Sequence, residues 1–214
     1  MDKELIRYWS HGPHYQFSDS VVFISWRLAG TLPQHVLHLF NELSTNPHKD
    51  DNRWACDQIK QNNAYLFQKF LRYDAELASL QNPDFSLNDP QVARIITGAF
   101  QYFAGQRYEL HAFCVMPNHV HLLIRALLKC YDEYYHMADI VQSLKSFTSR
   151  KINNHLGRKG QVWDHFYFDR VVSDLSSYEN VVQYIMINPV KAKLVRNIED
   201  WKYSFFDPKY LKKL

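Results

Sequence analysis

The sequence has few cysteines and no hydrophobic run long enough to cross a bilayer. Its three cysteines, Cys56, Cys114 and Cys130, form no Cys-x-x-Cys pair, and their odd number argues against a disulfide framework. The first five residues mix charges and contain no apolar core of a signal peptide. These absences argue against a secreted or membrane protein and predict a cytoplasmic one with no membrane partner.

The sequence also lacks a strong charge of one sign, because 25 Lys and Arg stand against 22 Asp and Glu, a net charge of +3. Basic residues are concentrated locally, with six basic and two acidic side chains between Ser143 and Arg170. Such a patch is compatible with phosphate contacts and equally with an ordinary solvated surface. Charge therefore permits a nucleic-acid partner without requiring one.

A hydrophobic fraction of 46% over 214 residues is sufficient for one packed domain. Hydrophobic periodicity and turn residues predict alternating strands and helices. By residue number, the pattern predicts strands at 21–28, 108–116 and 119–127, helices from 33 and at about 52–80, 88–102, 138–155 and 174–188, and an extended aromatic segment at 162–170. We expect a single domain over 1–214, with a helical insertion at about 32–104 and core motifs over 108–206.

Two histidines, His119 and His121, lie two positions apart in an apolar run that is typical of a strand. Residues i and i+2 of a strand point to the same face, so the two imidazoles would project side by side. Paired imidazoles on a stiff element provide half of a divalent-metal site. They could equally be ordinary strand histidines.

On the last predicted helix, Tyr184 and Asn188 are four residues apart and therefore share one face. The Asn side chain offers a carbonyl oxygen suited to magnesium or manganese, and a tyrosine phenol can act as a covalent nucleophile. With the two histidines they would form a metal-assisted phosphoryl-transfer centre. An arbitrary tyrosine among 14 is more often a core residue, and Asn before Pro189 is also a routine helix end.

Three ordered motifs together resemble one family, the REP-associated tyrosine transposases, relatives of the HUH single-strand transposases of the insertion-sequence type. The motifs are the run 115–123 around the histidine pair, the segment from Trp163 to Arg170, and the run 184–192 with Leu194 and Val195. The resemblance covers roughly residues 21–206. It implies an α+β fold, a ferredoxin-like (RRM-like) antiparallel sheet with helices on one face, here enlarged by a helical insertion.

The resemblance also implies a mechanism and its residues. His119 and His121 match the paired metal ligands, Asn188 matches the third ligand, and Tyr184 matches the single nucleophile. A bound Mg²⁺ or Mn²⁺ would polarise the scissile phosphate of single-stranded DNA. Attack by Tyr184 would leave a 5′-phosphotyrosine link, and the substrate would be a palindromic element folded into a hairpin.

DNA contacts are predicted in the basic and aromatic region that follows residue 143. The candidates are Lys145, Arg150, Lys151, Arg158, Lys159, Trp163 and Arg170, with Phe166 and Tyr167 as further rings that could stack on bases. The rings could instead belong to the core. A single-stranded or hairpin DNA partner and a homodimer are both compatible with the sequence.

Two other functions remain open at this stage. The chain could be a hairpin DNA- or RNA-binding protein that shares the fold but does not transfer strands. The sequence retains the residues expected as metal ligands and as the nucleophile, which favours the enzyme. An RRM-like RNA binder is disfavoured because the sequence has no Lys/Arg-Gly-Phe aromatic strand signature.

Overall fold

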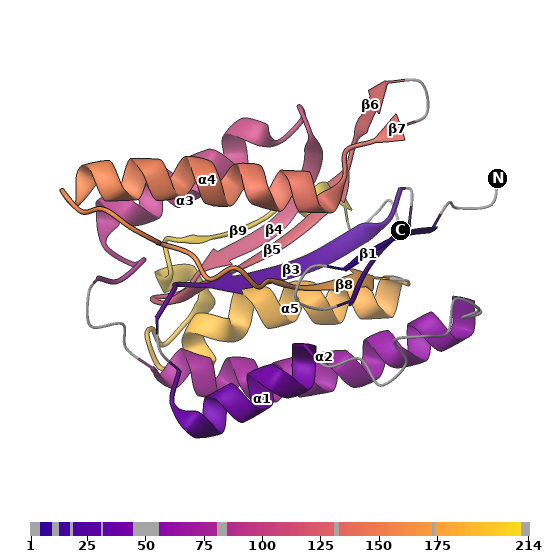
Figure 1. Ribbon diagram of the computed structural model, residues 1–214, viewed down its shortest axis with the longest axis horizontal. Coiled ribbons are helices and arrows are strands. Elements are labelled where there is room, and N and C mark those ends of the chain that lie inside the picture. The colour runs from indigo at the N-terminus through magenta and orange to yellow at the C-terminus, as the bar shows by residue number, and fades with distance from the viewer. Residues whose placement is uncertain are drawn as a thin grey trace.

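The computed structural model describes residues 5–9, 13–17, 19–30, 32–44, 56–80, 85–130, 133–172 and 174–210. Its centre is a five-stranded antiparallel sheet in the order β8-β3-β5-β4-β9 (Figure 1). The strands of this sheet are β3 (Val21–Arg27), β4 (Tyr108–Val115), β5 (His119–Ala126), β8 (Phe168–Val172) and β9 (Ser204–Phe206).

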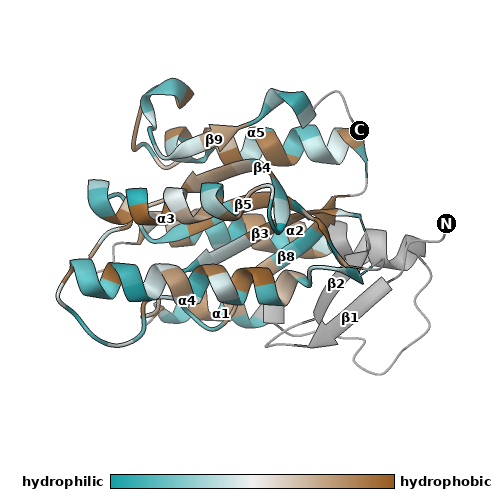
Figure 2. Cartoon of the chain, turned by 90° about the horizontal axis from the view of Figure 1, so that it is seen from above, coloured by the Kyte–Doolittle hydropathy of each residue, from teal (hydrophilic) through white to brown (hydrophobic). Residues whose placement is uncertain are grey.

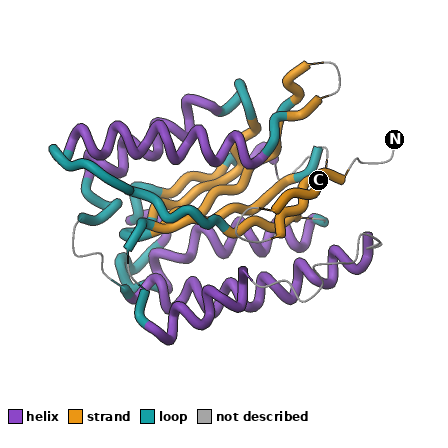
Figure 3. The backbone as a smooth tube through the Cα atoms, in the orientation of Figure 1, coloured by secondary structure: helices purple, strands orange, loops and turns teal. Residues whose placement is uncertain are grey.

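Helices α3 (Pro90–Phe103) and α4 (Met137–His155) cover one face of the sheet (Figure 3). Along the chain, β3, α3, β4, β5, α4 and β8 follow the βαββαβ order of a ferredoxin-like unit. The predicted α+β, ferredoxin-like fold is confirmed. Strand β9 extends the sheet beyond β4.

The other face also carries helices, which the sequence reading did not anticipate. They are α5 (Leu175–Lys191), α2 (Cys56–Ser79) and α1 (Gln34–Ser44) (Figure 1). Helices α1, α2 and α3 all lie within the predicted insertion at 32–104, so this region covers both faces. A sheet whose two faces are both apolar needs helices on both sides.

Two hydrophobic clusters, one on each side, follow from the alternation of side chains along the strands. On β5, Val120, Leu122 and Ile124 belong to the cluster under α3 and α4, whereas Leu123 belongs to the cluster under α2 and α5. Figure 2 shows largely hydrophobic central strands beneath helices that alternate hydrophobic and hydrophilic residues. His119 and His121 share the α2/α5 side with Leu123 because all three are odd-numbered positions of one strand.

The turn between β4 and β5 fastens α2 to the sheet. The Asn118 side-chain amide donates to the carbonyl oxygens of Leu77 and Leu80, both at 2.7 Å, where α2 ends. These bonds satisfy carbonyls that a helix terminus leaves without partners. The Pro117-Asn118 turn therefore sets where α2 lies relative to the histidine strand.

Helix α5 continues past Pro189, contrary to the prediction that proline ends it at Asn188. A proline this close to a helix end removes only one main-chain hydrogen bond. The last turn is closed by Ala192 N donating to Asn188 O and Leu194 N donating to Pro189 O, each at 2.9 Å. Lys193, with φ of 58°, then ends the helix.

Smaller elements complete the described chain. They are the hairpin β1 (Leu5–Trp9) and β2 (Pro13–Phe17), the hairpin β6 (Leu128–Cys130) and β7 (Glu133–Tyr134), and the short helices η1 (Ile198–Asp200) and η2 (Pro208–Tyr210). The predicted start of the second helix at about residue 52 lies outside the described residues. Among the helices described, none is long and apolar enough to cross a membrane.

Candidate active site

Five polar side chains from three elements meet beneath the sheet. His119 and His121 come from β5, Tyr184 and Asn188 from α5, and Asp74 from α2. Both histidines are 0% exposed and Asp74 is 2% exposed. The predicted pair and the predicted helix face are thus brought together within one chain, and a carboxylate joins them.

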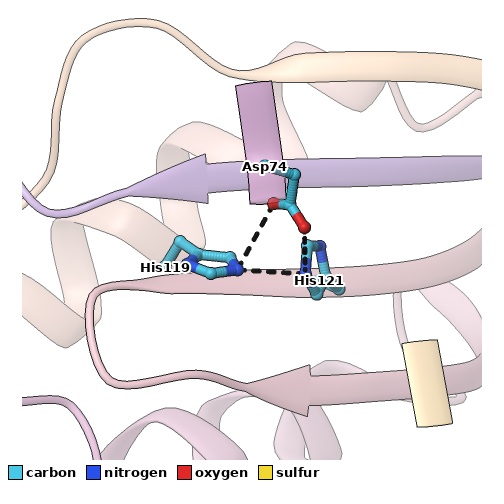
Figure 4. A group of neighbouring side chains, drawn as sticks. All are labelled: Asp74, His119 and His121. Atoms are coloured by element: carbon cyan, nitrogen blue, oxygen red, sulfur yellow. Dashed lines mark hydrogen bonds and ion pairs between the residues drawn. The ribbon is translucent and has the colours of Figure 1, made fainter. Parts of the chain in front are cut away.

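Asp74, His119 and His121 point toward one another (Figure 4). His119 Nε2 lies 3.3 Å from Asp74 Oδ1, and His121 Nε2 lies 3.6 Å from Asp74 Oδ2. The two Nε2 atoms are 3.1 Å apart. In the described parts of the chain, this is the only cluster of three His, Cys, Asp or Glu side chains with metal-binding spacing.

The hydrogen bonds of the two histidines fix where their protons lie. Because the Asn118 amide nitrogen donates to α2, its oxygen faces His119 Nδ1 at 2.6 Å and accepts from it. A neutral imidazole that donates a hydrogen bond through Nδ1 has an unprotonated Nε2, which can act as a metal ligand. His121 Nε2 accepts a hydrogen bond from the Asn188 amide at 2.8 Å, so it is unprotonated as well.

Two unprotonated imidazole nitrogens and a carboxylate oxygen therefore converge, and the His121 nitrogen is also the acceptor of the Asn188 amide. Asp74 Oδ1 is buried and has no hydrogen-bond partner among the described residues. Converging buried lone pairs repel unless a cation lies between them. The donor set of two nitrogens and one oxygen fits a divalent transition ion or magnesium.

The protonation states also suit cation binding. Burial lowers the pKa of His119, and it lowers the pKa of His121 to about 3, so both imidazoles are neutral at pH 7. Burial by itself would raise the pKa of Asp74. The positive charge that the histidines carry when they are protonated and the hydrogen bonds from Tyr184 and Asn188 oppose this effect, so the pKa of this carboxyl lies below its usual value.

The Tyr184 hydroxyl donates a hydrogen bond to Asp74 Oδ2. Its ring contacts Phe23 and Phe67 edge-on, with centroids at 6.0 and 5.9 Å, so the phenol is held in one orientation. Burial and the neighbouring carboxylate raise the pKa of Tyr184 well above its ordinary value. The nucleophile candidate is thus a positioned, protonated phenol.

Asn188 joins the cluster through an atom other than the one predicted. Its amide nitrogen, not its carbonyl oxygen, meets Asp74 Oδ2 at 3.1 Å and His121 Nε2 at 2.8 Å. In this orientation Asn188 positions the other groups, and a half-turn of the amide exchanges the two atoms.

Asp74 is the member of the cluster that the sequence motifs do not predict. It lies in the helical insertion, 45 positions before His119, and belongs to no motif. One signal was available: Phe67, Phe70 and Leu77 form the buried stripe of α2, and Asp74 occupies a position of the same stripe. A carboxylate among buried helix positions needs a partner.

Two of the predicted DNA-contacting residues are instead structural. Lys145 is 8% exposed and donates to three main-chain oxygens, those of Asp164, His165 and Phe166, at 3.0 to 3.2 Å. Trp163 is 4% exposed, and its indole nitrogen donates to Thr148 Oγ1 at 2.8 Å. Burial removes both from contact with a DNA strand in this structure. Phe166 and Tyr167 are core rings for the same reason.

The remaining predicted contacts fall into two groups. Arg150, Lys151, Arg158 and Lys159 lie at the end of α4 and in the turn after it, on the sheet face opposite the histidine cluster. Arg158 stacks over the Phe85 ring at 4.7 Å. Arg170 alone lies near the cluster, where it lines a cleft together with Tyr184.

Parts of this chain are similar in sequence to known proteins. Residues 87–188 match a family model described as transposase, IS200-like. The chain is 30% identical over 108 residues to a protein named REP-associated tyrosine transposase of Haemophilus influenzae, and 28% identical over 99 residues to the one of Escherichia coli K12. The matched segments cover 46% of this chain, and 59% and 54% of those two proteins, a little over half of their length.

A solved structure of a REP-associated tyrosine transposase bound to a REP hairpin has the same fold, with a TM-score of 0.53 at 15% identity. The superposition covers 92% of this chain and 82% of that one. The family-model match contains His119, His121, Tyr184 and Asn188, whereas Asp74 lies before it. The resemblance expected from the three motifs is therefore confirmed: the chain is similar to the REP-associated tyrosine transposases, and its residues 87–188 match the IS200-like transposase model.

Proposed function

We propose that this protein is a metal-dependent transposase that cleaves and rejoins single-stranded DNA at hairpin elements through Tyr184. The observation that carries the proposal is the hydrogen bond between the Tyr184 hydroxyl and Asp74, inside the same buried cluster as two bare imidazole nitrogens. A nucleophile and a cation site that share one carboxylate are suited to phosphoryl transfer.

In the proposed reaction, the Tyr184 hydroxyl gives its proton to Asp74 Oδ2, and its oxygen attacks the scissile phosphorus and forms a new O–P bond. The bond from phosphorus to the 3′ oxygen of the neighbouring nucleotide breaks, and that oxygen leaves as a hydroxyl after taking up a proton. The DNA is then attached to Tyr184 through its 5′ phosphate. Attack by another 3′-hydroxyl reverses these steps and rejoins the strand, so no other energy source is needed.

His119, His121 and Asp74 Oδ1 are the proposed ligands of a divalent ion, either Mg²⁺ or Mn²⁺, and Asn188 becomes a fourth if its amide turns. When bound, the ion supplies Lewis-acid stabilisation of the phosphate charge. Asp74 Oδ2 orients the phenol and is the group that its proton already contacts. Asn118 holds His119 in the tautomer that leaves Nε2 bare.

The whole chain is the proposed functional unit, because the helical region 32–104 contributes Asp74. The proposed ligands and the proposed nucleophile all come from one chain, so the proposal does not require a homodimer. Hairpin or single-stranded DNA is the proposed partner, as in the hairpin-bound relative, and the cytoplasm the proposed location.

Covalent trapping tests the proposal. The protein is incubated with end-labelled hairpin oligonucleotides copied from palindromic repeats beside its own gene, with Mn²⁺ or with chelator, and resolved on denaturing gels. We expect a labelled band at the protein's size that needs the metal and is absent in Tyr184→Phe. Tyr102→Phe, at a tyrosine 65% exposed on α3, is the matched control and should keep the band.

The alternative, a hairpin-binding protein on the same fold without strand transfer, makes a different prediction. It predicts tight retention of the hairpin with neither adduct nor cleavage under either metal. That result in the wild-type chain would overturn the transposase proposal.

A further inference from the structure

Two clefts flank Tyr184 between α2 and α5. One has a volume of about 460 Å³ and the other about 410 Å³, within the usual range for ligand sites. Leu71, Tyr184 and Lys191 line both clefts, so the two meet at the nucleophile candidate. Together they form a track that runs past Tyr184.

The larger cleft is lined by side chains that can both donate and accept hydrogen bonds. These are the amides Gln68, Asn180 and Gln183 and the hydroxyl Ser177. On α5, residues 177, 180, 184, 187 and 191 recur at helical spacing, which makes this wall one face of the helix. Bidentate amides are the groups that proteins use to read base edges.

Arg170 brings a positive charge to the same cleft. Its guanidinium stacks over the Phe67 ring at 4.2 Å, and its buried Nε has no hydrogen-bond partner among the described residues. An arginine with spare donors in a cleft is suited to a phosphate oxygen. Lys191, whose Nζ lies 5.7 Å from the centre of the Tyr184 ring, places a second positive charge where the clefts meet.

The smaller cleft differs in chemistry. Its walls include four small side chains, Ala75, Ala78, Ser79 and Ala192, together with Lys193. Asp74 and Asn188 of the cluster also line it. It contains basic and small groups but, apart from Asn188, no amide that could read a base.

We infer that the α2/α5 track holds single-stranded DNA across Tyr184, with the amide-lined cleft reading the base beside the scissile phosphate. Lys191 and Arg170 contact phosphates, and the small-residue cleft admits the strand on the other side without reading it. This inference rests on the proposed function and assigns its sequence specificity to Asn180, Gln183 and Gln68. These three side chains are exposed, so replacing them leaves the core intact.

A binding selection that does not depend on strand cleavage tests the track. The probe is a hairpin oligonucleotide with a single-stranded tail randomised at four positions, bound to the Tyr184→Phe protein in chelator and sequenced. We expect a base preference at one tail position, which Asn180→Ala or Gln183→Ala weakens at least about fivefold. Gln101→Ala, an exposed amide on α3, is the matched control and should leave the preference unchanged.

Lys191→Gln should weaken binding of all tail sequences equally. It should reduce the slope of log Kd against log salt by about 0.7, the value for one phosphate contact of a single strand. Lys129→Gln, an exposed lysine on β6, is the control that should not change the slope.

The outcomes separate this inference from the proposed function. An unchanged preference in the Asn180→Ala, Gln183→Ala double variant, or no preference in the parent protein, overturns the track even if wild type forms adducts. A preference that depends on these amides, with no adduct in wild type, overturns the transposase proposal and keeps the track. Tighter binding of the same tail made of RNA would show that the track accommodates RNA rather than DNA and would also overturn the inference.

Discussion

Two groups of buried polar side chains, one on each face of the central sheet, differ in how far their hydrogen bonds are satisfied. On the α3/α4 face, the ammonium of Lys145 is surrounded by three carbonyl oxygens, and the Trp163 indole nitrogen donates to Thr148. On the α2/α5 face, Asp74 Oδ1 and His121 Nδ1 are buried with no hydrogen-bond partner among the described residues.

Satisfied buried groups stabilise a fold, whereas unsatisfied ones cost free energy and persist where function requires them. The contacts of Lys145 and Trp163 therefore support the fold, whereas Asp74 and His121 belong to the cluster that we propose binds a cation. The basic and aromatic residues around α4, which the sequence pattern predicts as DNA contacts, lie on the face of the sheet opposite Tyr184. Variants on the two faces should separate activity from stability.

The largest expected effect is on metal binding at the α2/α5 face. His119→Ala removes one of three converging donors, so adduct formation should fall to background. Manganese at 100 times its Kd should stabilise wild type by about 2.7 kcal/mol, and this gain should vanish in the variant. Thermal unfolding with and without Mn²⁺ measures it, with the exposed His155→Ala as control; equal gains in both variants would contradict the assignment.

The next effect is on stability at the α3/α4 face. Lys145→Met leaves three main-chain oxygens without their donor, so we expect a loss of about 2 kcal/mol in the free energy of unfolding. Adduct formation by the folded fraction should continue. Urea denaturation compares it with the exposed Lys151→Met, which should change stability by less than about 0.5 kcal/mol. A Lys145→Met protein as stable as wild type would refute the structural role.

A third variant, on the α2/α5 face, should raise the stability of the protein while abolishing adduct formation. His121→Leu replaces a buried imidazole that has an unpaired nitrogen, and we expect a gain of about 1 kcal/mol at pH 7 without metal. The pKa of His121 is about 3 in the folded chain and about 6.5 in the unfolded chain. At pH values between these two, the unfolded state therefore binds more protons than the folded state.

Wild-type stability should therefore fall as pH decreases from 6.5 toward 3, and His121→Leu should reduce this loss. Denaturant midpoints at pH 7 and pH 4.5 measure the difference. His155→Leu, at an exposed histidine, is the control. If the variant were as sensitive to acid as wild type, His121 would not be the buried neutral group described above.

The smallest effect concerns the basic end of α4. The double variant Arg150→Gln, Lys151→Gln should weaken hairpin binding by about threefold, uniformly over sequences, because any phosphate contact there would be distant from Tyr184. Adduct formation at saturating DNA should be unchanged. Fluorescence anisotropy at two salt concentrations checks this, and a changed base preference would show that this surface reads sequence.

The sequence by itself determined the elements of the site that depend on local periodicity. The two-residue repeat of a strand places His119 and His121 on one face, and the four-residue repeat of a helix places Tyr184 beside Asn188. Both pairs are found as predicted because neighbours within one element do not depend on how elements pack. The βαββαβ order is likewise visible in the pattern of strands and helices along the chain.

Only the tertiary structure decided which distant residues join these pairs. Asp74 enters the cluster because the Asn118 amide fastens the end of α2 to the β4–β5 turn, a contact between residues about 40 positions apart. Lys145 and Trp163 are predicted as DNA contacts from the sequence, but tertiary packing buries both side chains. Burial and long-range packing depend on the whole fold, so local spacing cannot specify them.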